Sequence, residues 1–300
     1  MASLTKNKSD VYQIITDRIL QALDKGVVPW RKPWRGGSQG QPKSLSTRKP
    51  YNGINVWLLS MAATDAGYTS PYWVTYKKAQ ELGGQVRKGE KSTIAVFWKQ
   101  YEKERTDDTG AIVKDEIWLL RYYNLFNVDQ CDNLNPDKLP IDVQPDTDKK
   151  ELDFQPIEYC EHIVTNMQRR PEITHSNERR AYYRPSTDTV HLPDRKHFET
   201  ETGYYSVAFH ELGHSTGHEI RLGRKNFNVA SFGSGNYGKE ELVAEFCASM
   251  LCGICGIDNE TIDQAASYID NWKRTIKADK KLVVQAASAG QKAADYIQNI

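Results

Sequence analysis

The sequence predicts an α+β protein in which helices and a small sheet come first and a mostly helical half follows. The two longest strand-like runs lie before residue 130, whereas helical spacing of apolar residues dominates after residue 156. Charge divides in the same way, because residues 1–130 carry 20 basic and 13 acidic residues and residues 131–300 carry 20 and 26. We therefore expect two domains, 1–130 and 156–300, joined by a linker at 131–155.

The first helix is expected to follow Ser9, because serine is a favoured helix cap. Apolar residues then recur at helical spacing as far as Gly26, a residue type that often follows a helix end. Between residues 28 and 37 the helix cannot continue, because Pro29 and Pro33 remove backbone donors and clash with helical geometry. We expect a stiff, extended loop at this point.

Residues 52–66 are predicted to form a mostly buried helix, because apolar side chains occupy most positions. A second helix is expected to begin at Ser70 and Pro71, where serine caps and proline is tolerated, and to end at Gly83. A basic turn at 86–91 follows.

Two strand-like runs, 93–98 and 117–126, come next, and a polar connector at 102–110 separates them. Their spacing predicts a long antiparallel hairpin. Helices beside such a hairpin make the first domain α+β.

Basic and aromatic residues are interleaved in the first domain. Between Lys25 and Gln100 there are 13 basic residues against 3 acidic ones, and six of the seven tryptophans precede residue 130. Cations can follow a phosphate chain and rings can stack on unpaired bases, so this composition favours single-stranded DNA as a partner. The alternative is that the rings pack in the core and the cations are solvated. The candidate DNA-binding residues are Trp30, Arg31, Lys32, Trp34, Arg35, Arg48, Lys49, Trp73, Lys77, Arg87, Lys88 and Lys91.

Residues 131–155 are predicted to be the linker, because three prolines stand among many Asp and Lys residues without periodicity. A helix is expected from Pro156, since proline is favoured in the first turn. The runs 181–184 and 188–192 flank a Pro-Ser-Thr turn, which predicts a second hairpin. From residue 260 onward the chain is expected to be helical.

The five residues from His210 to His214, HELGH, form the strongest motif in the chain. On a helix, His210 and His214 lie one turn apart on the same face, where two imidazoles can hold one zinc ion. Glu211 stands beside the first ligand, where its carboxylate can reach a water on the ion. This arrangement is typical of zinc-dependent hydrolases.

A second helical run, from Lys239 to Leu251, offers a third ligand. It resembles the second helix of gluzincin metallopeptidases, and by that resemblance Glu241 is the third metal ligand. Glu245 would then accept a hydrogen bond from a ligand histidine and fix its orientation. Glu240 and Glu245 stay open as alternative third ligands. The expected cofactor is one divalent ion, Zn²⁺, although the sequence does not distinguish zinc from manganese.

The glycine-rich stretch 231–238 is expected to be a flexible loop before Glu241. Within it, Tyr237 could donate a hydrogen bond to a developing oxyanion, and the alternative is a ring that packs on the domain. In the mechanism that this site predicts, Glu211 takes a proton from water and passes it to a leaving amine. The substrate would then be a peptide bond.

Other features of the sequence argue against a membrane protein and against a secreted protein. The chain has no apolar run long enough to span a membrane and no apolar signal segment in its first ten residues. Five cysteines in 300 residues are typical of a reduced protein, and Cys252 and Cys255 are predicted to be buried thiols. We expect a cytoplasmic protein that does not contact a membrane.

Four strings carry a more specific resemblance: PWRKPW at 29–34, YNGIN at 51–55, GGQVRKGEK at 83–91 and YYNLFNV at 122–128. They resemble plasmid antirestriction proteins of the ArdC family, and the same segment is similar to one attached to plasmid conjugation primases. The gluzincin-like second half fits this family pattern, so the resemblance covers nearly the whole chain. In zincins the strand before the HExxH helix edges the cleft, and by resemblance residues 190–192 form that strand.

The resemblance implies a single-stranded DNA-binding domain, a metallopeptidase domain and a role in protecting incoming conjugative DNA from host restriction. A second reading is a metalloprotease that is recruited to DNA and cleaves a DNA-bound protein. A third is a DNA-binding protein with a structural metal site, against which the intact Glu211 counts.

Overall fold

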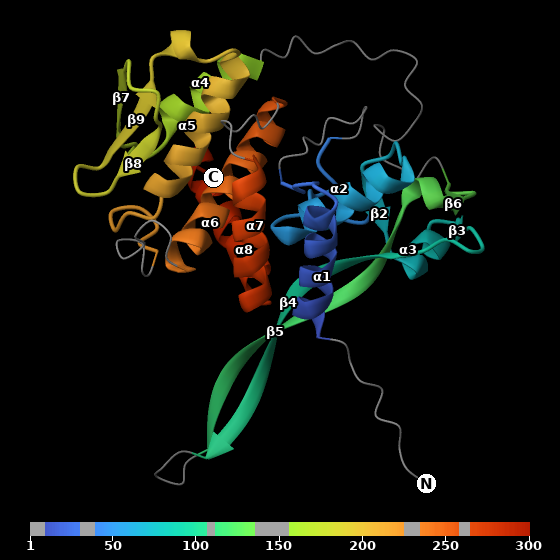
Figure 1. The fold of residues 1–300 in the computed structure, drawn as a ribbon. Coiled ribbons are helices and arrows are strands. Elements are labelled where there is room, and N and C mark those ends of the chain that lie inside the picture. The colour runs from blue at the N-terminus through green and yellow to red at the C-terminus, as the bar shows by residue number, and fades with distance from the viewer. Residues whose placement is uncertain (1–9, 31–39, 107–111, 136–155, 225–234, 258–264) are drawn as a thin grey trace.

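The computed structural model describes residues 10–30, 40–106, 112–135, 156–224, 235–257 and 265–300; of these, the side chains of 103–106, 112–118, 156, 235–237 and 265–268 are not described. Figure 1 shows a first half of helices and small sheets beside a second half built mainly from helices. The predicted α+β class is therefore confirmed. Among the described residues, no helix combines the length and the apolar character that crossing a lipid bilayer needs.

The first half includes two long helices and a four-stranded sheet. Helix α1 (Val11–Asp24) is capped by the side chain of Asp10, and the predicted cap, Ser9, lies outside the described residues. Helix α2 (Ile54–Ala66) ends at Gly67, whose φ of 70° is a conformation that glycine adopts without strain. The sheet has the order β1-β2-β5-β4, with β1 (Lys43–Ser44), β2 (Tyr72–Val74), β4 (Thr93–Thr106) and β5 (Ile112–Asn127).

The helix predicted from Ser70 is wrong in its first part, because β2 occupies that segment. Trp73 of β2 pairs with Asn127 of β5, and all three residues of the strand are buried. A helix begins only after Thr75, as α3 (Tyr76–Glu81). The partner that makes this segment a strand lies far away in the sequence, so the local cap-and-proline pattern could not reveal it.

The antiparallel hairpin of β4 and β5 is longer than predicted. Its pairing runs from Thr93 opposite Leu125 to Thr106 opposite Ile112, so much of the expected connector at 102–110 continues the strands. Figure 1 shows the outer part of this hairpin projecting from the body of the molecule.

The predicted boundary at residue 130 falls inside the fold of the first half. Strand β6 (Cys131–Asp132) pairs with β3 (Gln85–Val86). The N–H of Asn135 also donates to the carbonyl of Leu82 at 3.1 Å. The first five residues of the predicted linker therefore belong to the first half, and 136–155 lie outside the described residues.

The second half combines a three-stranded sheet with a group of helices. The helices are α4 (Pro156–Asn166), α5 (Glu201–Ser215), α6 (Gly235–Cys255), α7 (Ala265–Ala278) and α8 (Leu282–Gln298). The strands are β7 (Glu172–Ser176), β8 (Tyr182–Arg184) and β9 (Thr189–Pro193). Their order in the sheet is β7-β9-β8, with β9 parallel to β7 and antiparallel to β8. Residues 190–192 thus lie in the central strand, and the edge strand in contact with α5 is β8, which corrects the prediction.

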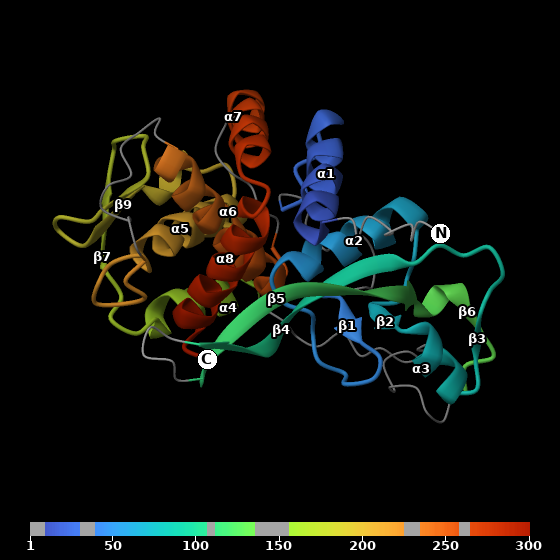
Figure 2. The same ribbon diagram turned by 90° about the horizontal axis from the view of Figure 1, so that it is seen from below.

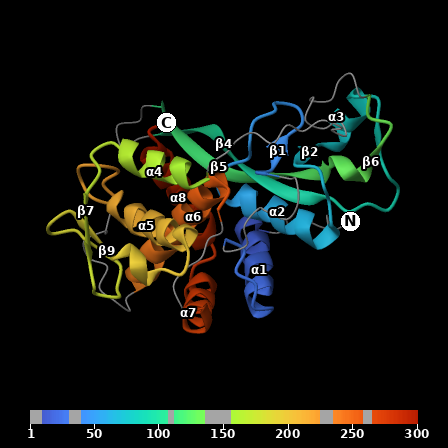
Figure 3. The same cartoon turned by 90° about the horizontal axis from the view of Figure 1, so that it is seen from above.

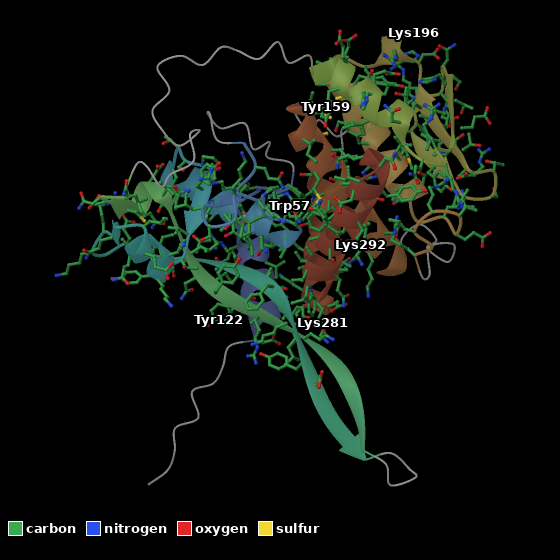
Figure 4. The ribbon with its side chains drawn as sticks, turned by 180° about the vertical axis from the view of Figure 1, so that it is seen from behind. Trp57, Tyr122, Tyr159, Lys196, Lys281 and Lys292 are labelled. Carbon is green, nitrogen blue, oxygen red and sulfur yellow. The ribbon has the colours of Figure 1, made fainter. Side chains whose placement is uncertain are left out.

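The two halves share one hydrophobic core. The ring of Trp30, just after α1, lies 4.9 Å from Phe246 of α6 and 5.3 Å from Trp272 of α7. Trp57 of α2 lies 4.5 Å from Phe246, and its Nε1–H donates to Ser249 at 3.3 Å. Figures 2 and 3 show α1 beside α7, and Figure 4 shows Trp57 where the halves meet. The first half therefore covers apolar surface of the second.

Candidate metal centre

The predicted metal ligands lie on two helices that pack closely. Helix α5 presents His210 and His214 one turn apart. Helix α6 approaches α5 at Gly213, where an added Cβ would lie 3.3 Å from the Cα of Ala244. The motif's glycine therefore permits a short distance between the helices, and this brings Glu241 opposite both histidines.

The three candidate ligand atoms form a compact triangle. Nε2 of His210 lies 3.1 Å from Nε2 of His214 and 3.1 Å from Oε1 of Glu241. Nε2 of His214 lies 3.6 Å from Oε2 of the same carboxylate. Nitrogen and oxygen ligands at about 2 Å from a tetrahedral zinc ion lie about 3.3 Å apart, so the triangle has a suitable size. The residues present therefore fit a divalent cation, and their assignment as ligands stays a prediction.

A carboxylate lies behind each histidine. Oε1 of Glu245 is 4.0 Å from Nδ1 of His210, and Oε1 of Glu240 is 3.8 Å from Nδ1 of His214. Carboxylates in this position orient a ligand imidazole and increase its basicity. Glu245 therefore lies where the sequence predicted a supporting carboxylate. From the sequence, Glu240 was expected only as an alternative ligand, and its supporting position behind His214 was not predicted.

Arg224 holds Glu240 in place. Its guanidinium contacts both carboxylate oxygens, with Nε 3.1 Å from Oε2. It also donates to the carbonyl of Gly213 at 3.0 Å, which ties Glu240 to the end of the HExxH helix. Sequence reasoning missed Arg224, because it follows α5 in an irregular segment that no periodicity marks.

Glu211 is buried beside the two histidines, with 7% of its surface exposed. Burial raises the pKa of its carboxyl group, while His210 and His214 oppose the shift. The backbone N–H of Tyr183, on β8, donates to this carboxylate. A fixed carboxylate with a raised pKa can accept a proton from water and release it again, which is the property that a general base and acid needs.

The charges of the centre attract one another. Burial acts to raise the pKa of Glu241, but His210 and His214 hold it well below its usual range. Burial likewise acts to lower the pKa of His214, but the carboxylates of Glu240 and Glu241 raise it to about 10. Several carboxylates converge on two imidazoles here, an arrangement that a divalent cation would stabilise.

Tyr237 does not lie in a loop, because α6 begins at Gly235 and includes it in the first turn. The predicted loop at 231–238 is therefore corrected at its carboxyl end. The side chain of Tyr237 lies outside the described residues, and its role towards an oxyanion stays a prediction.

Two of the predicted DNA-binding rings are buried. Trp30 has none of its surface exposed and Trp73 has 1%. Trp30 packs on Phe246 in the shared core, and Trp73 packs on Tyr68 at 6.1 Å. A ring without an accessible face cannot stack on a base, so the DNA-binding role predicted for these two tryptophans is corrected to a packing role.

The predicted cations divide into three groups. Arg87 uses its guanidinium within the first half, at 2.9 Å from Glu90, 3.4 Å from Asp132 and 2.6 Å from the carbonyl of Asp129. Five others are exposed on that half: Arg48, Lys49, Lys77, Lys88 and Lys91. The predicted residues outside the described part of the chain are Arg31, Lys32, Trp34 and Arg35.

A helix with the HExxH motif, a facing carboxylate on a later helix and a strand edge beside them define a zincin-like metal domain. Residues 158–289 match the family described as zincin-like metallopeptidase, and residues 9–126 match the N-terminal domain of the anti-restriction factor ArdC. The chain belongs to the ArdC antirestriction family.

Two solved structures of the antirestriction protein ArdC from plasmid R388 resemble this fold along its length. The metal-free structure is 38% identical with a TM-score of 0.76, and the Mn(II)-bound structure is 37% identical with a TM-score of 0.75. Each comparison covers 97% of both chains. Together with the zincin-like family match, the manganese-bound relative points to a divalent metal ion as cofactor.

Three curated proteins are similar to nearly the whole chain. An uncharacterized protein, y4eC, of Sinorhizobium fredii is 32% identical over 96% of this chain and 92% of its own length. Two Escherichia coli proteins named DNA primase TraC are each 36% identical over 97% of this chain. The chain spans 27% of one TraC protein and 20% of the other.

Proposed function

We propose that this protein is an antirestriction factor that binds single-stranded DNA and protects incoming conjugative plasmid DNA from host restriction. We propose further that its α5–α6 centre binds zinc and hydrolyses a peptide bond. The observation that carries the enzymatic part is the triangle of His210, His214 and Glu241 beside the buried carboxylate of Glu211.

The DNA-binding part is supported by the family and by charge. The relatives include an antirestriction protein of a plasmid and two proteins named DNA primase. The first 130 residues carry an excess of seven positive charges, and five of the predicted cations are exposed. Exposed cations of this kind contact phosphates and give affinity that falls with salt.

The chemical roles follow from the positions of the side chains. A bound divalent cation would polarise a substrate carbonyl and make a nearby water more acidic. Glu211 would accept a proton from the attacking water and deliver it to the leaving amine. Tyr183 holds the Glu211 carboxylate through its backbone N–H, and β8, the strand that carries it, lies at the edge of its sheet.

The DNA-binding part is tested with the full chain and a fluorescent single-stranded oligonucleotide, with duplex DNA as competitor, across a salt series. We expect binding that prefers single strands and weakens as salt rises. Transfer of a plasmid into a restricting host, with and without the gene, tests protection. Equal transfer in both cases would contradict the antirestriction role of this chain.

The enzymatic part is tested with Glu211→Gln and with Glu219→Gln, an exposed carboxylate that serves as the control. The chain is incubated with Zn²⁺ and a fluorescent casein, with and without single-stranded DNA. We expect hydrolysis by the wild type and the control but not by Glu211→Gln, while all three bind zinc. Hydrolysis by Glu211→Gln would contradict the assignment of Glu211 as the base, and loss of the metal from this variant alone would make Glu211 a ligand.

A further inference from the structure

One face of the outer β4–β5 hairpin carries exposed apolar side chains next to cations. Directly opposed residues of an antiparallel pair point to the same side, and alternate positions along each strand do so as well. We call this side of the hairpin the arm face. Its described members are Phe97, Lys99 and Tyr101 on β4 and Leu119, Arg121 and Tyr123 on β5.

The apolar members of the arm face are accessible. Phe97 has 40% of its surface exposed and Leu119 has 42%. The ring of Phe97 lies 5.4 Å from that of Tyr123, so its inner side is supported while the rest faces solvent. A phenylalanine ring held in this way offers a flat apolar platform.

The cations of the arm face are held beside the rings. Arg121 lies directly opposite Phe97 in the pairing, and its Nε–H donates to the hydroxyl of Tyr101 at 3.1 Å. Nζ of Lys99 lies 5.2 Å from the centre of the Tyr101 ring. The bond to Tyr101 uses one of the five N–H donors of the guanidinium. Within the described part of the chain, no carboxylate forms an ion pair with Lys99 or Arg121.

The opposite face of the hairpin is fastened to the body at its base. Val96 is buried in the shared core, and Trp98 lies 6.4 Å from Tyr12 of α1. Lys281, at the start of α8, lies 5.8 Å from the centre of the Tyr12 ring, and Figure 4 shows it beside the base of the hairpin. These contacts fix the orientation of the hairpin, so the arm face points away from them.

We propose that the arm face binds single-stranded DNA, with Phe97 stacked on an unpaired base and Lys99 and Arg121 on the neighbouring phosphates. This proposal rests on the DNA-binding function proposed above and adds the place of contact. Exposed rings between cations match the alternation of flat bases and charged phosphates. A duplex hides the faces of its bases, so the platform of Phe97 favours a single strand.

The proposed contact is short. Phe97 and Tyr101 are four residues apart on a strand, which corresponds to about 13 Å. The arm face therefore fits a few nucleotides, and the exposed cations elsewhere on the first half would contact the rest of the strand.

The test measures the affinity of the full chain for fluorescent oligothymidine by anisotropy across a salt series. The variants are Phe97→Ala, Phe97→Tyr, Lys99→Gln and Arg121→Gln. The matched controls are Tyr159→Ala and Lys196→Ala, an exposed ring and an exposed cation on the second half, far from the arm in Figure 4. The melting temperature of each variant shows whether it is folded.

Two kinds of effect are expected. Phe97→Ala weakens binding by between about 5-fold and 150-fold without changing the salt dependence, because stacking is not ionic. Phe97→Tyr retains the wild-type affinity. Lys99→Gln and Arg121→Gln each reduce the slope of log affinity against log salt by about 0.7.

If the wild type binds single-stranded DNA and the arm variants bind it as tightly as the two controls do, the arm face is not the contact. The proposed function would still stand in that case. Loss of affinity on Phe97→Ala for a protein partner, with DNA binding intact, would also overturn the arm face as the contact. A wild-type chain that does not bind single-stranded DNA at all would overturn the proposed DNA-binding function and the arm face with it.

Discussion

Glu241 places Oε1 at 3.1 Å from Nε2 of His210, across the contact between α6 and α5. The two residues belong to helices that also pack through Gly213 and Ala244, so the geometry of the centre depends on helix packing as much as on the motif. The same contact between the helices determines which of Glu240, Glu241 and Glu245 lies near the Nε2 atoms of the two histidines.

The first prediction separates Glu241 from Glu245. We expect Glu245→Gln to weaken zinc binding by about 10-fold to 100-fold, as for a residue that orients a ligand. Glu241→Gln should weaken it further, because a ligand is lost. Isothermal titration calorimetry of the full chain with Zn²⁺ and with Mn²⁺ measures both, with Glu219→Gln as control. A larger loss for Glu245→Gln than for Glu241→Gln would make Glu245 the ligand.

A second prediction concerns the contact between α6 and α8. A Cβ at Gly290 would lie 2.6 Å from the Cβ of Phe246 and 3.1 Å from the carbonyl of Val243, neither of which can rotate away. We expect Gly290→Ala to lower the free energy of unfolding by about 1–3 kcal/mol. Gly238→Ala is the control, because its nearest neighbour is the side chain of Thr275. Urea unfolding followed by circular dichroism compares them, and equal midpoints would contradict this account of the packing.

A third prediction concerns the shared core. Trp57 is fully buried between α2 and α6, so Trp57→Ala should lower the free energy of unfolding by about 3–5 kcal/mol. Because the core continues across both halves, the full chain should unfold in one transition. Far-ultraviolet circular dichroism and tryptophan fluorescence should then give the same midpoint. Two separate transitions, with only the first shifted by Trp57→Ala, would show that the halves are independent.

Local patterns predicted the parts of the site that depend on one helix. The spacing of His210 and His214 and the neighbouring Glu211 follow from helical geometry alone. The place of Glu241 came from a resemblance, because no local rule brings two helices together. Arg224 and the support it gives Glu240 were not predictable, since they depend on the path of an irregular segment after α5.

Longer-range packing explains the main errors. Trp30 stands in a proline-rich, cationic segment, which favours a binding loop, but its ring fills space between helices that come more than 200 residues later. Trp73 follows a serine and a proline that resemble a helix start, but a distant strand pairs with it. The exposed Phe97 was assigned only to a strand, because exposure depends on which face the body covers.

A fourth prediction concerns pH. Burial acts to raise the pKa of Asp188, but hydrogen bonds from Arg221 and Tyr183 lower it below its ordinary value. A lowered pKa in the folded chain means that the stabilisation is present above about pH 4, the unfolded value, and is lost as the pH falls through the folded value. Arg221 has a fully buried side chain, so Asp188→Asn should cost about 3–5 kcal/mol at pH 7.

Urea unfolding at a series of pH values tests this prediction. The difference between wild type and Asp188→Asn should be constant above about pH 5 and should narrow below pH 4 as the wild-type carboxylate is protonated. Asp194→Asn is the control, because Asp194 pairs with the exposed Lys196 and should change stability by about 1 kcal/mol or less. If the difference in unfolding free energy between the wild type and Asp188→Asn were the same at pH 3 and pH 7, the charge of Asp188 would contribute nothing to stability.

The most direct test of the metal centre is zinc X-ray absorption on the full chain loaded with one equivalent of Zn²⁺. We expect nitrogen and oxygen ligands at about 2.0–2.1 Å, with the multiple scattering that imidazole rings produce. The imidazole signal should fall by half in His214→Ala. A shell of sulfur at about 2.3 Å, or a spectrum unchanged in His214→Ala, would contradict a zinc site at His210, His214 and Glu241.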